Sequence, residues 1–460
     1  MGEIEPGAAR PPLSARALAA RILERVIDEG AWSQKAIDGE LRHFRGDRRE
    51  GAFATLLVYG VLTWRESIDA ALNRRLRSGL SSMPPRARHH FRVAAYQLGW
   101  LSARIPASAA VNEAVNLIRL ETNAGLSGVA NAVLRGLARD ASTAFTPEQT
   151  GDLVVDLARR IAIPDWIAAE LVEQLPPERC DAVGQHWNDP TPVHLRVRNG
   201  DVHTALLKLN EAGFEADIHA VVPGAVTLRG GSAMDAMNTW AEQLTIQDAG
   251  AQLAVLCLPP TLDGAVLDAC AGLGVKSVQL HDRYPGSRLV CTDRNATKLR
   301  QLSALVEANA VVASWDIPDP TPAAVQQEAP FAVVLVDAPC SGLGTIGRHP
   351  EVRQNRKFAD IQSLALVQRT MLDSVAPLVA PGGWLLYVVC TFTRAEGVEQ
   401  VKSFLARHPD FSVDVPTVDT AEPGVDWSSL IDPDGCITLW PDRVAADTFT
   451  LCRLRRRSAP

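Results

Sequence analysis

The chain has 460 residues, enough for about two to four domains. Its composition of 47% hydrophobic, 22% charged and 5% aromatic residues excludes a disordered or fibrous protein. The longest apolar runs, such as 384–390, are too short to cross a membrane, and residues 1–10 have no basic start and no apolar core. We therefore expect no membrane segment and no secretory signal. Eight cysteines without a CxxC pair or a metal-ligand spacing to the ten histidines predict a cytoplasmic protein that binds no metal.

Charge is distributed unevenly along the chain. The net charge is −7, yet residues 1–140 hold 20 Lys and Arg against 14 Asp and Glu, and 19 of those 20 cations are Arg. The guanidinium group suits contacts with phosphates and bases. A basic first third therefore predicts a part that docks on an anion such as RNA. A general preference for Arg, in a chain with only six Lys, would give the same bias.

The first 140 residues have a helical pattern throughout. Ser14 is a good N-cap for a helix that Gly30 can end. Four further segments have apolar residues at helical spacing: 53–64, 91–101, 109–120 and 127–137. No fixed repeat is present, so we predict a compact all-α N-terminal domain over residues 1–141, followed by a helical connector over 142–190.

Short strands follow the connector. Residues 193–197 and 225–228, around a helical segment at 205–212, predict a small α/β subdomain, similar to an RNA-recognition fold, over 191–241. From 242 to 460 short apolar runs alternate with helical segments, which predicts a doubly wound, Rossmann-like α/β domain with ligands at the carboxyl ends of its strands. The predicted strands are 266–267, 288–292, 311–314, 331–336 and 384–389, and the predicted helices are 296–309, 359–379 and 394–407.

Small and acidic residues follow the first three predicted strands. The first strand ends at Asp268 and leads into the loop Cys270, Ala271, Gly272, Leu273, Gly274, Val275 and Lys276. Small residues there let a ligand approach the backbone at a helix N-terminus. Asp293 ends the second strand and could bind ribose hydroxyls, while Asp316 follows the third and could bond an exocyclic amine. Each Asp alone is more often a helix cap, but the three together predict an adenosine-containing cofactor.

Cysteines stand at the ends of the fourth and fifth strands. Cys340 lies in the polar turn Asp-Ala-Pro-Cys-Ser-Gly at 337–342, which has no core pattern, and Cys390 follows the apolar run 384–389. Buried cysteines usually behave as small hydrophobic residues. We expect that behaviour of Cys180, Cys257, Cys291, Cys436 and Cys452. Two cysteines at the ends of neighbouring strands are the most informative feature of the sequence.

The sequence around these cysteines carries a resemblance. Residues 337–344, Asp-Ala-Pro-Cys-Ser-Gly-Leu-Gly, followed by Arg-His-Pro at 348–350, closely resemble the RNA cytosine-5 methyltransferases of the Sun family. The loop 268–277 resembles the cofactor loop of that family, and Tyr-Val-Val-Cys-Thr at 387–391 resembles its nucleophile strand.

The helical domain carries a second resemblance. Segments that resemble the NusB-like RNA-binding domain of antitermination factors lie at 58–62, 111–115 and 129–135. In this order, the two parts resemble the bacterial Sun/Fmu (RsmB) family of small-subunit ribosomal RNA cytosine-5 methyltransferases. The resemblance covers nearly the whole chain and implies small-subunit ribosomal RNA as the partner and a monomeric enzyme.

The resemblance implies a role for each residue of the cysteine turn. Cys390 would add to carbon 6 of the cytosine, which makes carbon 5 reactive towards a methyl group, and Cys340 would assist the elimination. Asp337 would hydrogen-bond the edge of the cytosine, while Pro339 would fix the turn. Such chemistry needs an unstacked base, in a loop or an exposed strand.

The resemblance also implies S-adenosyl-L-methionine as the cofactor. It would lie along residues 270–276 and border Asp337, with Asp293 on the ribose and Asp316 near the adenine. The cofactor loop departs from the family pattern, because Leu273 stands in place of Pro and Val275 in place of the second Gly. Val275 brings a branched Cβ to a turn where the backbone normally passes close to the cofactor.

Other departures leave alternatives open. Val388 and Val389 replace the usual Ser-Thr before the nucleophile, and three further positions differ from common family residues: Gly347, Gln354 and Asp442. One alternative is an RNA-binding module with a weakened or inactive methyltransferase site. Another is cytosine-5 methylation of a different RNA, such as transfer RNA. The helical domain could also serve packing or dimerisation without RNA contact. The retention of both Cys340 and Cys390 favours the enzyme, since a pure binding module needs no thiol pair.

Overall fold

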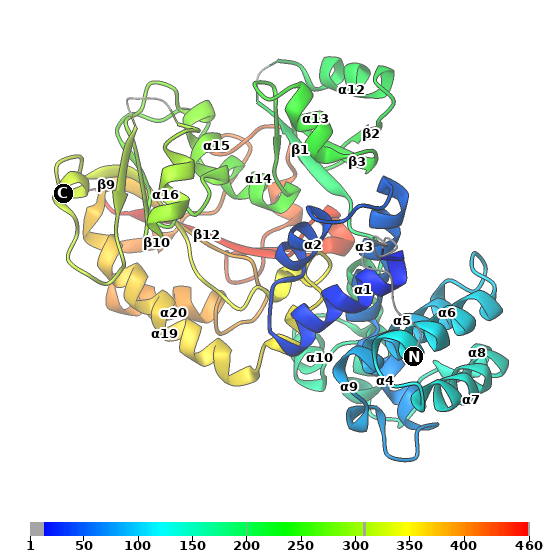
Figure 1. The fold of residues 1–460 in the computed structure, drawn as a ribbon. Coiled ribbons are helices and arrows are strands. Elements are labelled where there is room, and N and C mark those ends of the chain that lie inside the picture. The colour runs from blue at the N-terminus through cyan, green and yellow to red at the C-terminus, as the bar shows by residue number, and fades with distance from the viewer. Residues whose placement is uncertain (1–12, 199, 307–309, 459–460) are drawn as a thin grey trace. The chain divides into compact units, whose positions relative to one another are not determined.

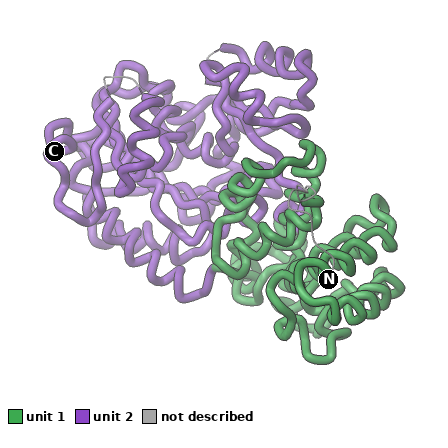
Figure 2. Tube along the Cα trace, in the orientation of Figure 1, with its two compact units in different colours: residues 1–184, 349–355 green, residues 185–348, 356–460 purple. Residues whose placement is uncertain are grey.

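The computed structural model describes residues 13–198, 200–306 and 310–458. Residues 1–10, where we expect no secretory signal, lie outside the described residues, as do residues 307–309 of the predicted helix 296–309. The chain divides into two compact units (Figure 2). Unit 1 comprises Met1–Gly184 and His349–Asn355, and unit 2 comprises Gln185–Arg348 and Arg356–Pro460.

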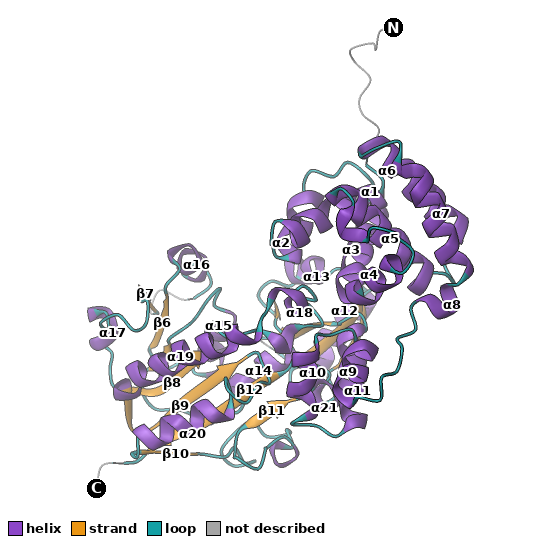
Figure 3. Ribbon diagram, turned by 90° about the horizontal axis from the view of Figure 1, so that it is seen from below, coloured by secondary structure: helices purple, strands orange, loops and turns teal. Residues whose placement is uncertain are grey.

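Unit 1 is built from helices (Figure 3). They are α1 (Ala15–Leu23), η1 (Glu24–Asp28), α2 (Ser33–Leu41), α3 (Arg48–Thr63), α4 (Arg65–Asn73), η2 (Leu80–Ser82), α5 (Pro85–Trp100), α6 (Ala107–Glu121), α7 (Leu126–Arg139), α8 (Ala141–Ala144), α9 (Leu153–Ile161), α10 (Asp165–Val172) and α11 (Pro177–Asn188), whose last turn belongs to unit 2. Ser14 caps α1 by accepting a hydrogen bond from the Ala17 N–H at 3.3 Å. The predicted all-α N-terminal domain is confirmed.

A short segment from late in the sequence completes unit 1. It contains α18 (Val352–Asn355). Glu351 accepts a hydrogen bond from the Ser33 N–H at the start of α2, at 2.9 Å. The buried Arg353 donates to the carbonyl oxygens of Thr63, at 3.2 Å, and Ala162, at 3.0 Å, at the ends of α3 and α9. These bonds satisfy backbone groups that helix ends leave without partners, so the segment is part of the helical fold.

Unit 2 begins with a four-stranded antiparallel sheet in the order β2-β3-β1-β4. Its elements are β1 (Val193–Val197), α12 (Val202–Glu211), β2 (Glu215–Ile218), β3 (Ala225–Gly230), α13 (Ala233–Thr239) and β4 (Leu244–Ile246). Leu195 and Val226 on the strands pack with Leu209 of α12 and Ala236 of α13 in one core. The predicted small α/β part is confirmed.

The rest of unit 2 is an eight-stranded sheet. Seven strands follow the order β10-β12-β9-β8-β5-β6-β7, and β11 pairs with β12. The strands are β5 (Val266–Asp268), β6 (Leu289–Asp293), β7 (Val311–Ser314), β8 (Phe331–Asp337), β9 (Val379–Val389), β10 (Phe411–Val413), β11 (Ile437–Leu439) and β12 (Phe449–Arg456). Strands β5 to β9 are parallel. The chain runs from β5 to β6 and β7 on one side of β5, and then returns to β8 and β9 on its other side, so the strand order reverses at β5. The doubly wound α/β prediction is confirmed, and ligands bind such sheets where the order reverses.

Helices cover both faces of this sheet (Figure 1). They are α14 (Ala249–Leu256), α15 (Val275–Arg283), α16 (Ala296–Leu302), α17 (Ala323–Gln326), η3 (Leu343–Thr345), α19 (Phe358–Val375), η4 (Ala376–Leu378), α20 (Val398–Arg407), η5 (Trp427–Ser429) and α21 (Pro441–Val444). Side chains alternate along β8, so Leu335 packs in the core with α14 and α15, while Val334 and Val336 pack in the core with α19 and α20.

Several sequence predictions need correction. The helix predicted at 296–309 ends at Leu302, and the helix predicted at 394–407 begins only at Val398. Cys436 and Cys452 are buried but form a disulfide, so treating them as free thiols is wrong. Cys180, Cys257 and Cys291 are free and buried, as expected. Across 13–198, 200–306 and 310–458, no helix is long and apolar enough to cross a membrane, and no group of three His, Cys, Asp or Glu could hold a metal.

Candidate active site

Two cysteines meet at the carboxyl ends of β8 and β9. The parallel register pairs Asp337, the last residue of β8, with Val388 on β9. The turn after β8 and the residue after β9 therefore lie at the same edge of the sheet. The Cys340 and Cys390 sulfurs are 3.3 Å apart, and both residues are partly exposed. The structure thus brings together the two thiols that stand out in the sequence.

Backbone contacts hold the turn that carries Cys340. The Ala338 N–H donates to the Val388 carbonyl at 2.9 Å, and the Gly344 N–H donates to the Cys390 carbonyl at 3.0 Å. A Cβ at Gly344 would lie 1.9 Å from the Thr448 carbonyl oxygen, so this position needs glycine. The Pro339 carbonyl accepts from Gln368 at 3.0 Å. The turn is fixed against its neighbours on several sides.

Glu396 is a residue of this site that the sequence prediction missed. Its carboxylate is fully buried and accepts hydrogen bonds from the Ser341 N–H at 2.8 Å and the Ser341 hydroxyl at 2.6 Å. It also accepts from the Thr393 hydroxyl at 2.9 Å and the Gln368 amide at 3.0 Å. The prediction placed Glu396 in a helix, but residues 394–397 form a turn. An acidic residue six positions after the second cysteine, just before an amphipathic helix, was the available signal.

The two thiols differ in their electrostatic surroundings. The pKa of Cys340 is raised well above its usual value by a hydrogen bond with Cys390, by burial, and by the charges of Cys390 and Glu396. These surroundings disfavour a thiolate on Cys340. Cys390 lies within electrostatic reach of the Lys276 ammonium, and this interaction contributes to a raised pKa of Lys276.

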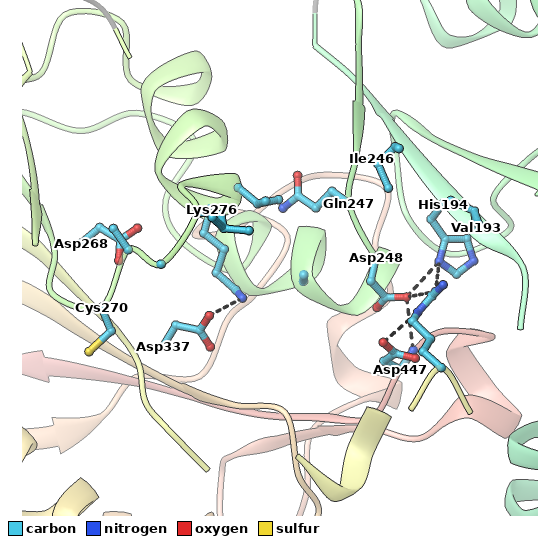
Figure 4. A pocket seen from close by; sticks show the side chains of 16 residues that line it. Val193, His194, Ile246, Gln247, Asp248, Asp268, Cys270, Lys276, Asp337 and Asp447 are labelled. Atoms are coloured by element: carbon cyan, nitrogen blue, oxygen red, sulfur yellow. Dashed lines mark hydrogen bonds and ion pairs between the residues drawn. The ribbon is translucent and has the colours of Figure 1, made fainter. Parts of the chain in front are cut away.

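Lys276 forms an ion pair with Asp337, with Nζ and Oδ2 2.7 Å apart (Figure 4). Burial lowers the pKa of Lys276, but the charge and hydrogen bond of Asp337 outweigh it, so the net shift is upward. The sequence prediction placed Lys276 along the cofactor loop. In the structure, its ammonium lies instead on the carboxylate that ends β8. A fixed cation and a hydrogen-bonding carboxylate therefore stand beside the thiol pair.

The cofactor loop keeps its backbone shape despite its unusual side chains. Gly272 and Gly274 have φ values of 57° and 88°, which favour glycine, and the chain has glycine at both positions. Leu273 is 52% exposed, and Val275 is 36% exposed and begins α15. Val275 has a helical rather than a left-handed backbone, so the turn itself does not require glycine at this position.

A cavity of about 400 Å³ joins the cysteines to the strand ends. The predicted site residues that line it are Cys270, Gly272, Asp293, Asp316, Asp337, Pro339, Cys340 and Cys390. Asp293 accepts a hydrogen bond from the Gly272 N–H at 3.0 Å, which fixes the loop against β6. Each carboxylate oxygen can accept a second bond, so Asp293 can still bind hydroxyl groups. The cavity thus offers a space that reaches from the thiols to Asp293 and Asp316.

A second cavity, of about 410 Å³, also borders Asp337 (Figure 4). The loop residues that line it are Cys270, Ala271, Gly272, Leu273, Val275 and Lys276, while Gly274 lines neither cavity. The predicted cofactor residues are therefore divided between two cavities. Cys270, Gly272 and Asp337 are common to both, so they separate one from the other.

An ion network forms the far wall of the second cavity. Arg348 contacts Asp248 at 2.6 Å and Asp447 at 2.9 Å, and His194 contacts Asp248 at 3.0 Å. Burial and the charge of Asp248 raise the pKa of Asp447 to about 7. Burial raises the pKa of Asp248, but His194 and Arg348 outweigh it and lower the net value. Arg348 follows the cysteine turn closely in sequence, so this network anchors its downstream end.

Known proteins are similar in sequence to this chain. A family described as 16S rRNA methyltransferase RsmB/F matches residues 255–455, the NusB family matches 13–139, and an RsmF/B-like ferredoxin-like domain matches 163–235. The ribosomal RNA small subunit methyltransferase B of Vibrio cholerae is 33% identical over 408 residues, which cover 86% of this chain and 90% of that protein. The Xylella fastidiosa protein of the same name is 31% identical, over 88% of this chain and 91% of its own length.

Solved structures share the fold. The crystal structure of PH0851 covers 97% of this chain and 100% of its own, with a TM-score of 0.75 at 21% identity. The structure of NSun6 from Pyrococcus horikoshii with SFG covers 62% of this chain and 95% of its own, with a TM-score of 0.50 at 14% identity. At these identities the likeness concerns the fold alone.

Proposed function

The chain belongs to the RsmB/F family of 16S rRNA methyltransferases, and we propose that it methylates carbon 5 of a cytosine in small-subunit ribosomal RNA through a covalent bond between a cysteine and the cytosine. The observation that carries this proposal is the thiol pair. Cys340 and Cys390 lie 3.3 Å apart beside the Lys276–Asp337 ion pair. Carbon 5 of cytosine is a weak nucleophile, so its methylation needs a thiolate that adds to carbon 6.

The surroundings of the cysteines support separate roles. Cys390 lies within electrostatic reach of the Lys276 ammonium, and by the family resemblance it would be the nucleophile that adds to carbon 6. Addition consumes the Cys390 charge and its hydrogen bond, two of the causes that raise the Cys340 pKa. Cys340 then loses its own proton to solvent more easily. Once carbon 5 carries the methyl group, the Cys340 thiolate can accept the carbon 5 proton, and the electrons of that C–H bond expel Cys390 from carbon 6 as a thiolate. Asp337 would hydrogen-bond the cytosine edge, and Pro339 would keep the turn in place.

The 400 Å³ cavity suits S-adenosyl-L-methionine, which supplies an electrophilic methyl group when bound. Asp293 would bind the ribose, and Asp316 would lie near the adenine. Cys270 and Gly272 line this cavity from the loop 270–276. Lys276 would act through its ion pair with Asp337, and four loop residues would act by shaping the backbone: Ala271, Leu273, Gly274 and Val275.

Unit 1 would supply RNA contacts. Residues between α2 and the start of α3 form an exposed basic group: Arg42, His43, Arg45, Arg48 and Arg49. Replacing Arg48 and Arg49 with Glu should weaken binding to ribosomal RNA and lower its salt dependence, because each phosphate contact releases counterions. The double Lys variant keeps the charge and should keep the salt dependence. Unchanged binding by the Glu variant would favour a packing role for this domain.

We propose domain limits at 1–141, 142–190, 191–241 and 242–460.

Transfer of labelled methyl groups to unmodified small-subunit ribosomal RNA tests the proposal. We expect label in 5-methylcytosine with the wild-type chain and none with Cys390→Ala, while both bind S-adenosyl-L-methionine. Label on transfer RNA instead would transfer the proposal to another substrate. A chain that binds ribosomal RNA but no cofactor would act as a binding module, and label at another atom of the base would overturn the cysteine mechanism.

A further inference from the structure

Glu396 is a buried charged group that the mechanism above does not use. Its side chain is 0% exposed, and its four hydrogen-bond partners are all donors: the N–H and hydroxyl of Ser341, the hydroxyl of Thr393 and the amide N–H of Gln368. The two N–H groups can only donate, and the two hydroxyls can rotate to donate as well, so the site can supply four hydrogen bonds to a carboxylate. A negative charge on Glu396, under the cysteine turn, is thus fully hydrogen-bonded.

The carboxylate ties together the segments that carry the two cysteines. Ser341 directly follows Cys340, and Thr391 directly follows Cys390. The Ser341 Oγ lies within hydrogen-bond distance of both Glu396 Oε2, at 2.6 Å, and Thr391 Oγ1, at 2.9 Å. All three residues are fully buried, so these bonds are shielded from water. One carboxylate thus fixes the relative position of the residues next to both thiols.

The same carboxylate makes the two sulfurs electrostatically unequal. The groups that act on Cys340 include Cys390 and Glu396, and Tyr387, whose hydroxyl donates to the Glu396 carbonyl at 2.6 Å, lies within electrostatic range. None of these three groups carries a positive charge, so a thiolate on Cys340 is disfavoured. Cys390 instead faces Cys340 and the Lys276 ammonium. The negative group Glu396 therefore acts on Cys340, whereas the positive group Lys276 interacts with Cys390.

We propose that Glu396 is a positioning residue that holds the two cysteines in register and directs the negative charge of the pair to Cys390 Sγ, leaving the proton on Cys340 Sγ. Without this charge the two thiols would compete as nucleophiles, and Cys340 could add to carbon 6 of the cytosine in place of Cys390. The significance of this arrangement for catalysis rests on the proposed function, but the charge assignment itself does not.

The charge assignment can be tested without RNA or cofactor. Iodoacetamide reacts with thiolates, so mass spectrometry of the full chain after brief treatment measures how fast each cysteine is alkylated. In the wild type we expect Cys390 to react faster than Cys340. In Glu396→Gln the ratio of Cys390 to Cys340 alkylation should fall about tenfold, which corresponds to one pKa unit. The matched control is Glu399→Gln, three residues away with a side chain 57% exposed, which should keep the wild-type ratio. An unchanged ratio in Glu396→Gln, or an equal fall in the control, would overturn the assignment.

A second variant tests the positioning role and remains available if Glu396→Gln fails to fold. Ser341→Ala keeps the Glu396 charge and removes only the hydroxyl between Glu396 and Thr391. We expect kcat for RNA methylation to fall about tenfold, with unchanged cofactor affinity and an unchanged alkylation ratio. An unchanged kcat would overturn the positioning role. A wild-type chain that methylates no RNA but alkylates as expected would contradict the proposed function and leave the charge assignment standing.

Discussion

The two sides of the candidate site are built differently. On the cysteine side, the side chains of Ser341, Gln368 and Glu396 are fully buried and hydrogen-bonded to one another. On the cofactor side, Leu273 and Val275 are exposed, and glycine backbone conformations shape the loop. The cysteine side therefore depends on the identity of its side chains, whereas the cofactor loop depends mainly on its backbone shape. Replacing a residue that is typical of the family should therefore impair function far less in the cofactor loop than on the cysteine side.

Among variants that keep the nucleophile Cys390, the largest effect should come from Cys340→Ala. We expect turnover to fall at least about 100-fold, because Cys390 can still add to the base but elimination lacks its partner. Methylated RNA should then stay on Cys390 and appear as a shifted band on a denaturing gel. Cys270→Ala removes a thiol from the cofactor side of the same cavity and should accumulate no such band. Normal turnover by Cys340→Ala would remove the assigned division of labour.

Replacing a glycine should also cost more stability on the cysteine side than in the cofactor loop. At Gly344 an added Cβ would lie 1.9 Å from the Thr448 carbonyl and 3.0 Å from the Cys390 carbonyl, both backbone atoms. Gly344→Ala should therefore lower the free energy of unfolding by about 3 kcal/mol. At Gly272 nothing lies within 4 Å, so Gly272→Ala should lower it by only about 1–2 kcal/mol, from its positive φ. Urea unfolding measures both, and equal losses would contradict the comparison.

Sequence patterns revealed the cysteine side only in part. The polar turn and the apolar strands located Cys340, Cys390 and Asp337, because a motif next to a strand end has a fixed place in a doubly wound sheet. The sequence did not reveal Glu396, because the hydrophobic periodicity of α20 extends back over residues 394–397, which form a partly buried turn. The Lys276–Asp337 ion pair was also missed, because it joins side chains 61 positions apart.

The helical unit shows the same limit. Local spacing predicted its longest helices, because a helix face repeats within a few residues. No local pattern shows that Glu351 and Arg353 complete that unit, because Arg353 bonds to Ala162 from 191 positions further along the chain. The Cys436–Cys452 disulfide is likewise a pairing in space rather than a spacing. The sequence patterns therefore missed long-range polar contacts, and also whole elements such as α2, α4 and β12.

Asp268 is an exception on the cofactor side, because it is buried and its behaviour should depend on pH. Burial raises its pKa from 3.8 to about 7, although the Ser277 hydroxyl at 2.6 Å opposes the shift. Because the folded state holds the Asp268 proton more tightly than the unfolded state does, this proton stabilises the fold at low pH. The stabilisation is lost as the pH rises towards 7. Between pH 5 and pH 7 the wild type should lose roughly 2 kcal/mol relative to Asp268→Asn in urea unfolding. Parallel curves for the two chains would show that Asp268 ionises normally in the fold.

The smallest effect should come from restoring family residues in the cofactor loop. Leu273→Pro and Val275→Gly change side chains that are 52% and 36% exposed, and Val275 has a helical backbone that glycine does not improve. The dissociation constant for S-adenosyl-L-methionine, measured by calorimetry, should therefore change less than about threefold, under 1 kcal/mol. Asp293→Ala, which removes the carboxylate bonded to the Gly272 N–H, should weaken binding about tenfold or more and serves as the sensitive control. A tenfold gain from either loop substitution would show that side chains, not backbone shape, limit cofactor binding, and the contrast between the two sides would fail.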